Sequence, residues 1–228
     1  MYEKYIKRIF DIALSLGGLI VLWPVYLLLC IVVRVKLGSP VLFRQDRPGK
    51  DEKIFKLCKF RTMTDQRDEQ GNLLPDDVRL TEFGKFLRST SLDELPELIN
   101  ILKGEMSVVG PRPQLVRDMV FMTAQERKRH DVKPGLTGLA QISGRNAIAW
   151  ERKLQYDLEY IENLSFKEDV KILFKTVTKV FEREGISDGE NATAEDLGDY
   201  LLRVGKIDKT QYIKGQEESK DLLKAVFK

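Results

Sequence analysis

The sequence predicts an α-rich α+β protein in which one long apolar helix at the N-terminus anchors a small body with little β-strand. Residues 12–33 form an uncharged apolar run of bilayer length. About 195 residues follow, enough for one moderate domain with a core of its own. In that body apolar side chains recur mostly at helical spacing, and one stretch alternates as a half-buried strand does.

The apolar run contains a proline near its middle, Pro24. A proline inside a helix removes a hydrogen bond and bends or breaks the helix. A spanning helix usually has its Lys/Arg excess on the cytoplasmic side alone, whereas this run has cations on both sides. They are Lys4, Lys7, Arg8, Arg34, Lys36, Arg44 and Arg47. Two hypotheses stay open: a re-entrant helix-break-helix over residues 1–36, and a single kinked span, which is the commoner object. A cleaved signal peptide fits less well, because the run exceeds an h-region of ~7–15 residues.

The composition indicates which classes of ligand the body is suited to bind. Residues 1–60 hold eleven Lys/Arg against five Asp/Glu. Such charge favours an anionic leaflet or phosphate-bearing ligands, with a solvated basic surface as an equal alternative, and no nucleic acid is expected. The chain has one histidine, His130, and two distant cysteines, Cys30 and Cys58. A bound metal would therefore take oxygen ligands, which favours Mg²⁺ or Mn²⁺ over Zn²⁺.

The first half of the body combines a predicted strand with two helices. Residues 54–63 alternate roughly between apolar and polar, and polar residues 65–79 predict a surface loop. Helices are expected over 81–89 and from Ser91 to the stop signal Gly104. The second of these should bury one face, made of Leu92, Leu95, Leu98, Ile99 and Leu102.

The second half alternates irregular segments with helices. Residues 107–113 and 133–146 are too rich in proline and glycine for regular structure. Helices are expected over 114–130, 147–163 and 166–184.

The chain then divides into a membrane segment (1–36), a body that holds the chemistry (37–187) and a C-terminal part (188–228). A linker is expected at 185–191. The remaining tail, 192–228, should form two short helices, and no chemistry can be assigned to it.

The predicted helix at 166–184 has an apolar stripe bordered by a basic one. The apolar stripe comprises Val170, Leu173, Phe174, Val177, Val180 and Phe181, and the basic one Lys167, Lys171, Lys175, Lys179 and Arg183. This pattern is typical of a helix that lies in the membrane interface. A core helix with a solvated basic edge is an equal alternative.

The segment S-L-D-E at 91–94 supports two interpretations. Structurally, Ser91 and Glu94 form a capping box for the following helix, which is the usual meaning of such a string. Functionally, a carboxylate at a helix N-terminus can attack phosphorus, and its neighbour can bind a divalent cation. Arg88, one turn upstream, would welcome phosphate. The two roles are compatible.

Further polar residues have a structural and a functional interpretation. In Pro-Arg-Pro at 111–113, two prolines restrict the backbone around Arg112, which suits bidentate phosphate recognition, although a plain rigid loop is the default. Lys59 and Arg145 are cations in extended or irregular stretches, and Asp157 is by default an exposed acid on a helix.

The order of these strings identifies a family. They are F-R-Q-D-R-P-G (43–49), K-F-R-T-M (59–63), S-L-D-E-L-P (91–96), G-E-M-S-V-V-G-P-R-P (104–113), K-P-G-L-T-G-L-A-Q (133–141) and G-R-N (144–146). Over roughly residues 1–187 the chain resembles the bacterial sugar transferases, specifically the small monotopic polyprenyl-phosphate phosphoglycosyl transferases. It looks most similar to the Campylobacter-type members that start N-linked glycan assembly.

The resemblance implies a set of residue roles. Members have a re-entrant membrane helix broken at a proline that matches Pro24, and commonly have Ser before it, where this chain has Trp23. The acidic dyad of the family falls on Asp93, the implied nucleophile, and on Glu94, which would help hold Mg²⁺. The phosphate- and substrate-binding positions fall on Lys59, Arg88, Arg112, Arg145 and Asp157.

The implied reaction moves a sugar 1-phosphate from a UDP-sugar to polyprenyl phosphate, with release of UMP. It would occur on the cytoplasmic face of a bacterial inner membrane, in contact with phospholipid, and the sugar stays open. A homodimer or other glycan-assembly enzymes are candidate partners. Two alternatives stay open: a membrane-surface binding or scaffold module, and a Mg²⁺-dependent lipid phosphatase that uses the same carboxylates.

Overall fold

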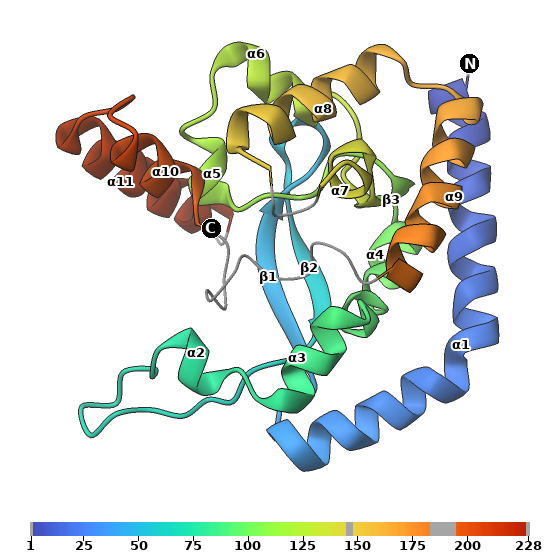
Figure 1. The fold of residues 1–228 in the computed structure, drawn as a ribbon, viewed down its shortest axis with the longest axis horizontal. Helices are drawn as coiled ribbons and strands as arrows, with labels where there is room; N and C mark the ends of the chain where they lie inside the picture. Colours follow the sequence, from blue (N-terminus) through green and yellow to red (C-terminus); the bar gives the residue numbers. More distant parts are fainter. Residues whose placement is uncertain (1, 145–147, 183–194, 227–228) are drawn as a thin grey trace.

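The computed structural model describes residues 2–144, 148–182 and 195–226, and it confirms the predicted α-rich α+β class. A twisted two-stranded ribbon stands in the middle of the body, and helices surround it (Figure 1). The long helix α1 runs along one side, while α10 and α11 lie on the opposite side.

Helix α1 (Lys7–Leu37), with the preceding turn Tyr2–Ile6, is the one described helix long and apolar enough to cross a membrane. Only 11% of its most apolar window is buried inside the protein. The predicted break is a bend in an unbroken helix: Pro24 lies inside α1, and the helix visibly changes direction (Figure 1). A proline is an established cause of such a kink because it lacks the N–H that would continue the hydrogen-bond ladder.

The first turns of α1 are fastened to the body by polar contacts. Lys7 forms a buried ion pair with Asp169, and Arg8 donates to the carbonyl oxygens of residues 101 and 102 at 2.6 and 2.7 Å. Asp11 accepts hydrogen bonds from Ser107 Oγ at 2.8 Å and from the backbone N–H of residue 108 at 2.9 Å. Two of the cations that precede the apolar run, Lys7 and Arg8, therefore bind the body. They are weaker evidence for the orientation of the helix in a membrane than unbound flanking charges would be.

Strands β1 (Leu42–Pro48) and β2 (Ile54–Phe60) form an antiparallel hairpin that pairs Leu42 with Phe60. The strand predicted at 54–63 is confirmed over most of its length. β1 was not predicted, because its residues are mostly polar and half-exposed and show no clear alternation.

A second sheet lies in segments that were expected to be irregular. β3 (Ser107–Val109) pairs in parallel with β4 (Gly135–Thr137), and α7 (Leu139–Ile142) follows. A Cβ built on Gly135 would lie 2.1 Å from the backbone nitrogen of Gly110. The glycine allows the two chain segments to approach each other, so the prediction of irregular structure was wrong here.

The segment around the predicted dyad differs from the expected single helix. Helix α3 (Glu82–Ser89) matches the prediction, and a short α2 (Asp76–Arg79) lies in the predicted loop. Ser91, however, adopts a left-handed conformation with φ 55° and caps nothing, so the predicted capping box is absent. Residues Leu92–Glu94 form a 3₁₀ turn, and α4 (Glu97–Lys103) begins only after Pro96.

The end of α4 is as predicted, with Gly104 at φ 85°. Its buried face is as predicted only in part. Leu98 is buried, and Leu92 and Leu95 pack against the core. Ile99 and Leu102 are half-buried, and the other buried residues of α4 are Glu97, Asn100 and Ile101.

The helix expected over 114–130 is instead two short helices, α5 (Val116–Met119) and α6 (Ala124–Arg127), and a final turn, Lys128–His130. Thr123 starts α6 by accepting a hydrogen bond from the N–H of Glu126, whose carboxylate accepts from the N–H of Thr123. This capping box starts a new helix, so residues 114–130 do not form one continuous helix.

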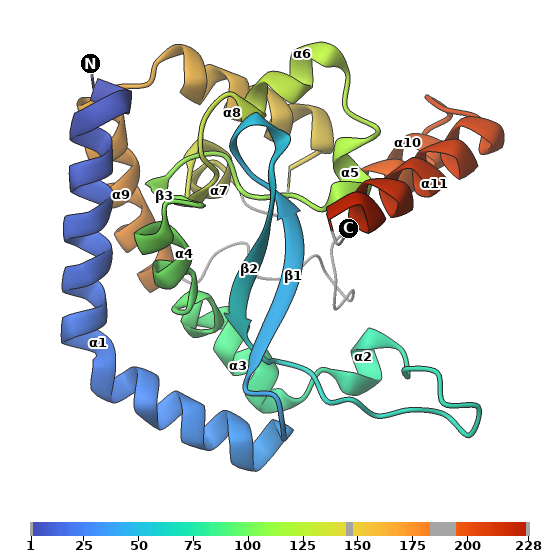
Figure 2. The same ribbon diagram turned by 180° about the vertical axis from the view of Figure 1, so that it is seen from behind.

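Helices α8 (Trp150–Glu162) and α9 (Phe166–Glu182) match their predicted ranges. α9 lies beside the first part of α1 in both ribbon views (Figures 1 and 2). It buries Asp169 and Ile172, while Phe174 and Val177 are 72% and 56% exposed. Phe174 and Val177 of the apolar stripe thus face outward, which favours the interfacial alternative, whereas Leu173 packs against the core.

The tail forms two helices as expected, α10 (Leu197–Arg203) and α11 (Lys209–Val226), although α11 is not short. The predicted linker 185–191 and residue Arg145 lie outside the described residues.

Candidate active site

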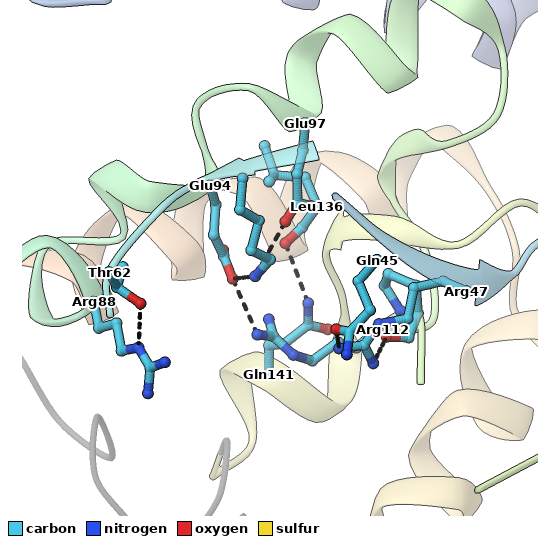
Figure 3. Close-up of polar contacts among 11 residues, drawn as sticks. Gln45, Arg47, Thr62, Arg88, Glu94, Glu97, Arg112, Leu136 and Gln141 are labelled. Carbon is cyan, nitrogen blue, oxygen red and sulfur yellow. Dashed lines mark hydrogen bonds and ion pairs between the residues drawn. The ribbon is translucent and has the colours of Figure 1, made fainter. Parts of the chain in front are cut away.

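Charged side chains from four separate segments lie beside the β1–β2 ribbon; Glu94 and Arg112 face each other, and Arg88 lies to one side of them with Thr62 (Figure 3). Lys59 comes from the end of β2, Arg88 from the last turn of α3, and Asp93 and Glu94 from the 3₁₀ turn. Arg112 comes from the segment 110–115 between β3 and α5, which we call the Arg112 loop.

Glu94 is the centre of the ionic network. Its Oε1 accepts hydrogen bonds from Lys59 Nζ at 2.7 Å and from Arg112 Nη2 at 3.0 Å. Although burial opposes ionisation, the two cations lower the pKa of Glu94 to about 2. Glu94 is therefore a permanent carboxylate that holds both cations in place.

Asp93 differs from its neighbour in electrostatic environment. Its side chain is 7% exposed. Burial raises its pKa to about 6; Glu94 also raises it, against the opposing effects of Lys59, Arg112 and Arg88. Two adjacent carboxyl groups with separated pKa values commonly take different chemical roles. Asp93 is the one that can exist in both protonation states near neutral pH.

Glu97 is a member of this site that the sequence analysis missed. Its Oε1 lies 3.2 Å from Lys59 Nζ, and its side chain is almost fully buried. Burial raises its pKa to about 7. The spacing between Glu94 and Glu97 could have revealed it, because residues three apart share a helix face.

Arg88 is a further cation that acts electrostatically on Asp93. Its Nε donates to Thr62 Oγ1 at 3.1 Å. Burial lowers the pKa of Arg88, and the charge of Asp93 acts against that effect. The guanidinium groups of Arg88 and Arg112 both act on Asp93. Two such groups suit the binding of a phosphate-bearing anion.

Two other arginines hold the backbone of the Arg112 loop through hydrogen bonds to its carbonyl oxygens. Arg129 Nη2 donates to the carbonyl oxygen of Arg112 at 2.6 Å, and Arg47 Nη1 donates to that of Pro113 at 3.0 Å. Arg129 in turn bonds Asp157 Oδ2 at 2.7 Å, and both side chains are at most 3% exposed.

The structure therefore places Asp157 in the interior, where it pairs with the arginine that supports the Arg112 loop. By default it was expected to be an exposed acid, which is wrong, because it is buried and its carboxylate is bound by Arg129. The substrate-binding role that the family resemblance implies stays a prediction. Of the predicted residues, Lys59, Arg88, Asp93, Glu94 and Arg112 are brought together, whereas Asp157 acts on the site through Arg129 and the backbone of Arg112.

Residues 2–183 match the bacterial sugar transferase family. The chain belongs to that family. It is 52% identical over 190 residues to the uncharacterized sugar transferase EpsL of Bacillus subtilis, covering 83% of this chain and 94% of the relative.

Other relatives of this family member have named activities. It is 44% identical over 185 residues to a UDP-glucose:undecaprenyl-phosphate glucose-1-phosphate transferase of Klebsiella pneumoniae, covering 77% of this chain and 40% of that protein. It is 38% identical over 206 residues to the undecaprenyl-phosphate galactose phosphotransferase of Salmonella typhimurium, covering 80% and 42%. The sugar transferase thus spans about two-fifths of the length of the relatives whose names give a substrate.

The predicted Mg²⁺ has a partial set of ligands in this chain. Among the residues that the structure describes, no group of three or more His, Cys, Asp or Glu side chains is arranged around a common metal position. Mg²⁺ sites of phosphoryl-transfer enzymes commonly use one or two carboxylates and complete the shell with water and substrate phosphates. Glu94, the expected metal ligand, offers a hard oxygen donor of that kind beside Lys59 and Arg112.

Proposed function

We propose that this sugar transferase moves a sugar 1-phosphate from a UDP-sugar to undecaprenyl phosphate through an intermediate on Asp93. The observation that carries the proposal is the buried Asp93, whose raised pKa contrasts with the permanently ionised Glu94 between Lys59 and Arg112. The printed activities of the relatives from Klebsiella and Salmonella support the two substrates.

The chemistry proceeds in two displacements at phosphorus. In the first, a carboxylate oxygen of Asp93 attacks the β-phosphorus of the UDP-sugar. The bond from that phosphorus to the bridging oxygen breaks, and UMP leaves with the bridging oxygen and its electron pair. In the second, a phosphate oxygen of undecaprenyl phosphate attacks the phosphosugar-aspartyl phosphorus. The bond to Asp93 breaks, the carboxylate is regenerated, and the product is a lipid diphospho-sugar.

Phosphoryl transfer of this kind depends on positioning and on stabilising negative charge. Arg112 and Arg88 are placed to bind the diphosphate, and Lys59 keeps Glu94 and Glu97 from repelling it. When bound at Glu94, Mg²⁺ would neutralise the charge of the diphosphate and of the departing UMP. The isolated, buried His130 is not needed, since no step requires an imidazole.

We further propose that α1 is re-entrant and that the body lies on the cytoplasmic face. Support comes from the bend at the proline-containing part of α1 and from its outward apolar side chains, such as Val21 at 74% and Trp23 at 62% exposure. The exposed Phe174 and Val177 of α9 would meet the same membrane surface. This arrangement lets one site meet a soluble nucleotide sugar and a lipid phosphate at headgroup level.

The test is a panel of UDP-sugars offered to purified protein with Mg²⁺ and undecaprenyl phosphate, scored by UMP release. One or a few UDP-sugars should release UMP, and the lipid product should carry the sugar of the active donor. A protein that releases inorganic phosphate from the lipid without any nucleotide sugar would be the lipid phosphatase instead. A protein that binds vesicles and turns over neither substrate would be the binding module.

The panel also addresses the predicted similarity to N-glycan-initiating enzymes. The named relatives use glucose or galactose, and a role in N-linked glycan assembly stays a prediction that only the active donor can test.

A further inference from the structure

The C-terminal helices form a hairpin that is docked on the body. α10 and α11 both pack beside α5, far from α1 (Figure 1). The ring of Phe121 is inserted at this junction and stacks on Tyr212, with ring centroids 6.0 Å apart. A Cβ on either Gly198 or Gly215 would lie 2.5 Å from an atom of the Phe121 ring. Two glycines, one on each helix, thus allow the hairpin to close on a single aromatic side chain.

One buried carboxylate connects this hairpin to the Arg112 loop. Asp118, 2% exposed, accepts a hydrogen bond through Oδ1 from the N–H of Leu197, the first residue of α10, at 2.9 Å. Its Oδ2 accepts from the N–H of Leu115, the last residue of the Arg112 loop, also at 2.9 Å. Arg117 adds an ion pair to Asp196 at 2.7 Å. A carboxylate that binds two backbone amides at once fixes their relative positions.

The connection reaches the site through a short stretch of chain. The loop is held at Arg112 by Arg129, at Pro113 by Arg47 and at Leu115 by Asp118. Of these three contacts, only the one from Asp118 also involves the hairpin. The Arg112 side chain is 44% exposed, so its position depends on how firmly the backbone beneath it is held.

We propose that the hairpin of residues 196–226 is a clamp that positions the Arg112 loop, with Asp118 as its positioning residue. Docking of the hairpin sets how firmly Arg112 is presented to the phosphates of the nucleotide. The family match ends at residue 183, so the clamp is a property of this chain outside the matched region. The nature of the ligand rests on the proposed function, whereas the mechanical coupling does not.

The most specific test of the clamp removes one hydrogen-bond donor, the backbone N–H of Leu197. Leu197→Pro deletes the donor to Asp118 at the first position of a helix, where proline is tolerated. Residue 196 already has φ −69° and ψ 155°, which suits a residue before proline. Leu197→Ala is the matched control, because it trims the same buried side chain and keeps the N–H.

Two measurements are made on the full chain in detergent: hydrogen exchange by mass spectrometry, and the dissociation constant of UMP by calorimetry. Leu197→Pro should speed exchange over residues 111–119 and weaken UMP binding about tenfold, the effect of one lost charge-assisted hydrogen bond. Leu197→Ala should leave both near the wild-type values. Equal behaviour of the two variants would overturn the clamp.

A second pair of variants covers the case in which the proline prevents folding. Gly215→Val places a branched side chain against Phe121, and Glu218→Val puts the same side chain on an exposed position of α11. Faster exchange at 111–119 in Gly215→Val alone supports the clamp. If Gly215→Val loosens 196–226 and leaves 111–119 unchanged, the clamp is wrong.

The two proposals fail in different ways. If the wild-type protein neither binds UMP nor releases it from any UDP-sugar, the proposed function fails, and the exchange data still decide the clamp.

Discussion

At the scale of single residues, the site works by giving two adjacent carboxyl groups different environments. Glu94 faces Lys59 and Arg112 directly and stays ionised, whereas Asp93 is buried and retains a pKa of about 6. A carboxylate with an elevated pKa is a better nucleophile than one held by two cations, since its electron pair is not already engaged. This difference supports the proposal that Asp93 attacks phosphorus and that Glu94 holds the surrounding charges in place.

The first prediction concerns pH. Because Asp93 attacks only as a carboxylate, UMP release should rise with pH through an apparent pKa near 6 and level off above it. Lys59 is the charge that most lowers the pKa of Asp93, so Lys59→Met should move this rise to higher pH by ~0.5–1 unit. Initial rates between pH 5 and 9 measure the shift.

Lys56→Met is the control for this experiment. Lys56 lies on the same strand, and its side chain is 50% exposed and paired with Asp46. A pH profile that moves equally in both variants would contradict the assignment of Asp93.

A second prediction concerns the support beneath Arg112. Asp157→Ala leaves Arg129 charged and buried without its partner, which should destabilise the protein by ~3 kcal/mol. The melting temperature in detergent measures this loss. Asp221→Ala breaks an exposed pair with Lys224 and should have little effect. If the two variants melt alike, the buried pair does not support the loop.

The residues also show what sequence reasoning can reach. Asp93, Glu94, Arg112, Lys59 and Arg88 were found because their strings occur in a recognisable order. Glu97 and Arg129 were missed because each acts through burial and a partner distant in sequence. The default expectation that Asp157 is an exposed acid was wrong, because a lone acid on a helix reveals no buried partner before the fold is known. The substrate-binding role that the family resemblance implies stays a prediction.

At the scale of elements, long periodic segments were predictable and close backbone packing was not. α3, α8 and α9 follow from helical spacing of apolar residues and lie within or at their predicted ranges. The β3–β4 pair was missed because its glycines look like loop signals, although they are needed for the approach of Gly110 to Gly135. The left-handed Ser91 and the 3₁₀ turn after it also contradict the local capping signal.

A third prediction belongs to α1. Single cysteines at Lys4 and Ser39, in a background without Cys30 and Cys58, should both react with a membrane-impermeant thiol reagent from the cytoplasmic side of oriented vesicles. The proposed re-entrant topology puts both ends on one side, because the bent helix would return to the face at which it enters. Labelling of the two positions from opposite sides would establish a true span.

Pro24→Ala provides the companion variant. Restoring the missing N–H should straighten α1, and a straight helix of 31 residues is about long enough to cross a bilayer. We therefore expect Pro24→Ala to move the label at Ser39 to the opposite side in part of the population.

At the scale of the whole molecule, the site lies where all three parts of the chain act together. α1 is fastened through Asp11 to the strand β3, which leads directly into the Arg112 loop. The C-terminal hairpin reaches the other end of that loop through Asp118. Helix α1 and the tail therefore contact the chain on either side of Arg112, and these tertiary contacts are ones that no local sequence signal indicates.

The central claim is that Asp93 carries the sugar phosphate, and intact-mass spectrometry tests it most directly. Protein mixed with its active UDP-sugar and Mg²⁺, without a lipid acceptor, should gain the mass of one sugar 1-phosphate, on the peptide that contains Asp93. The adduct should disappear when undecaprenyl phosphate is added, and Asp93→Asn should form none and release no UMP. Turnover in Asp93→Asn at the wild-type rate, or UMP release with no adduct at any stage, would contradict the account.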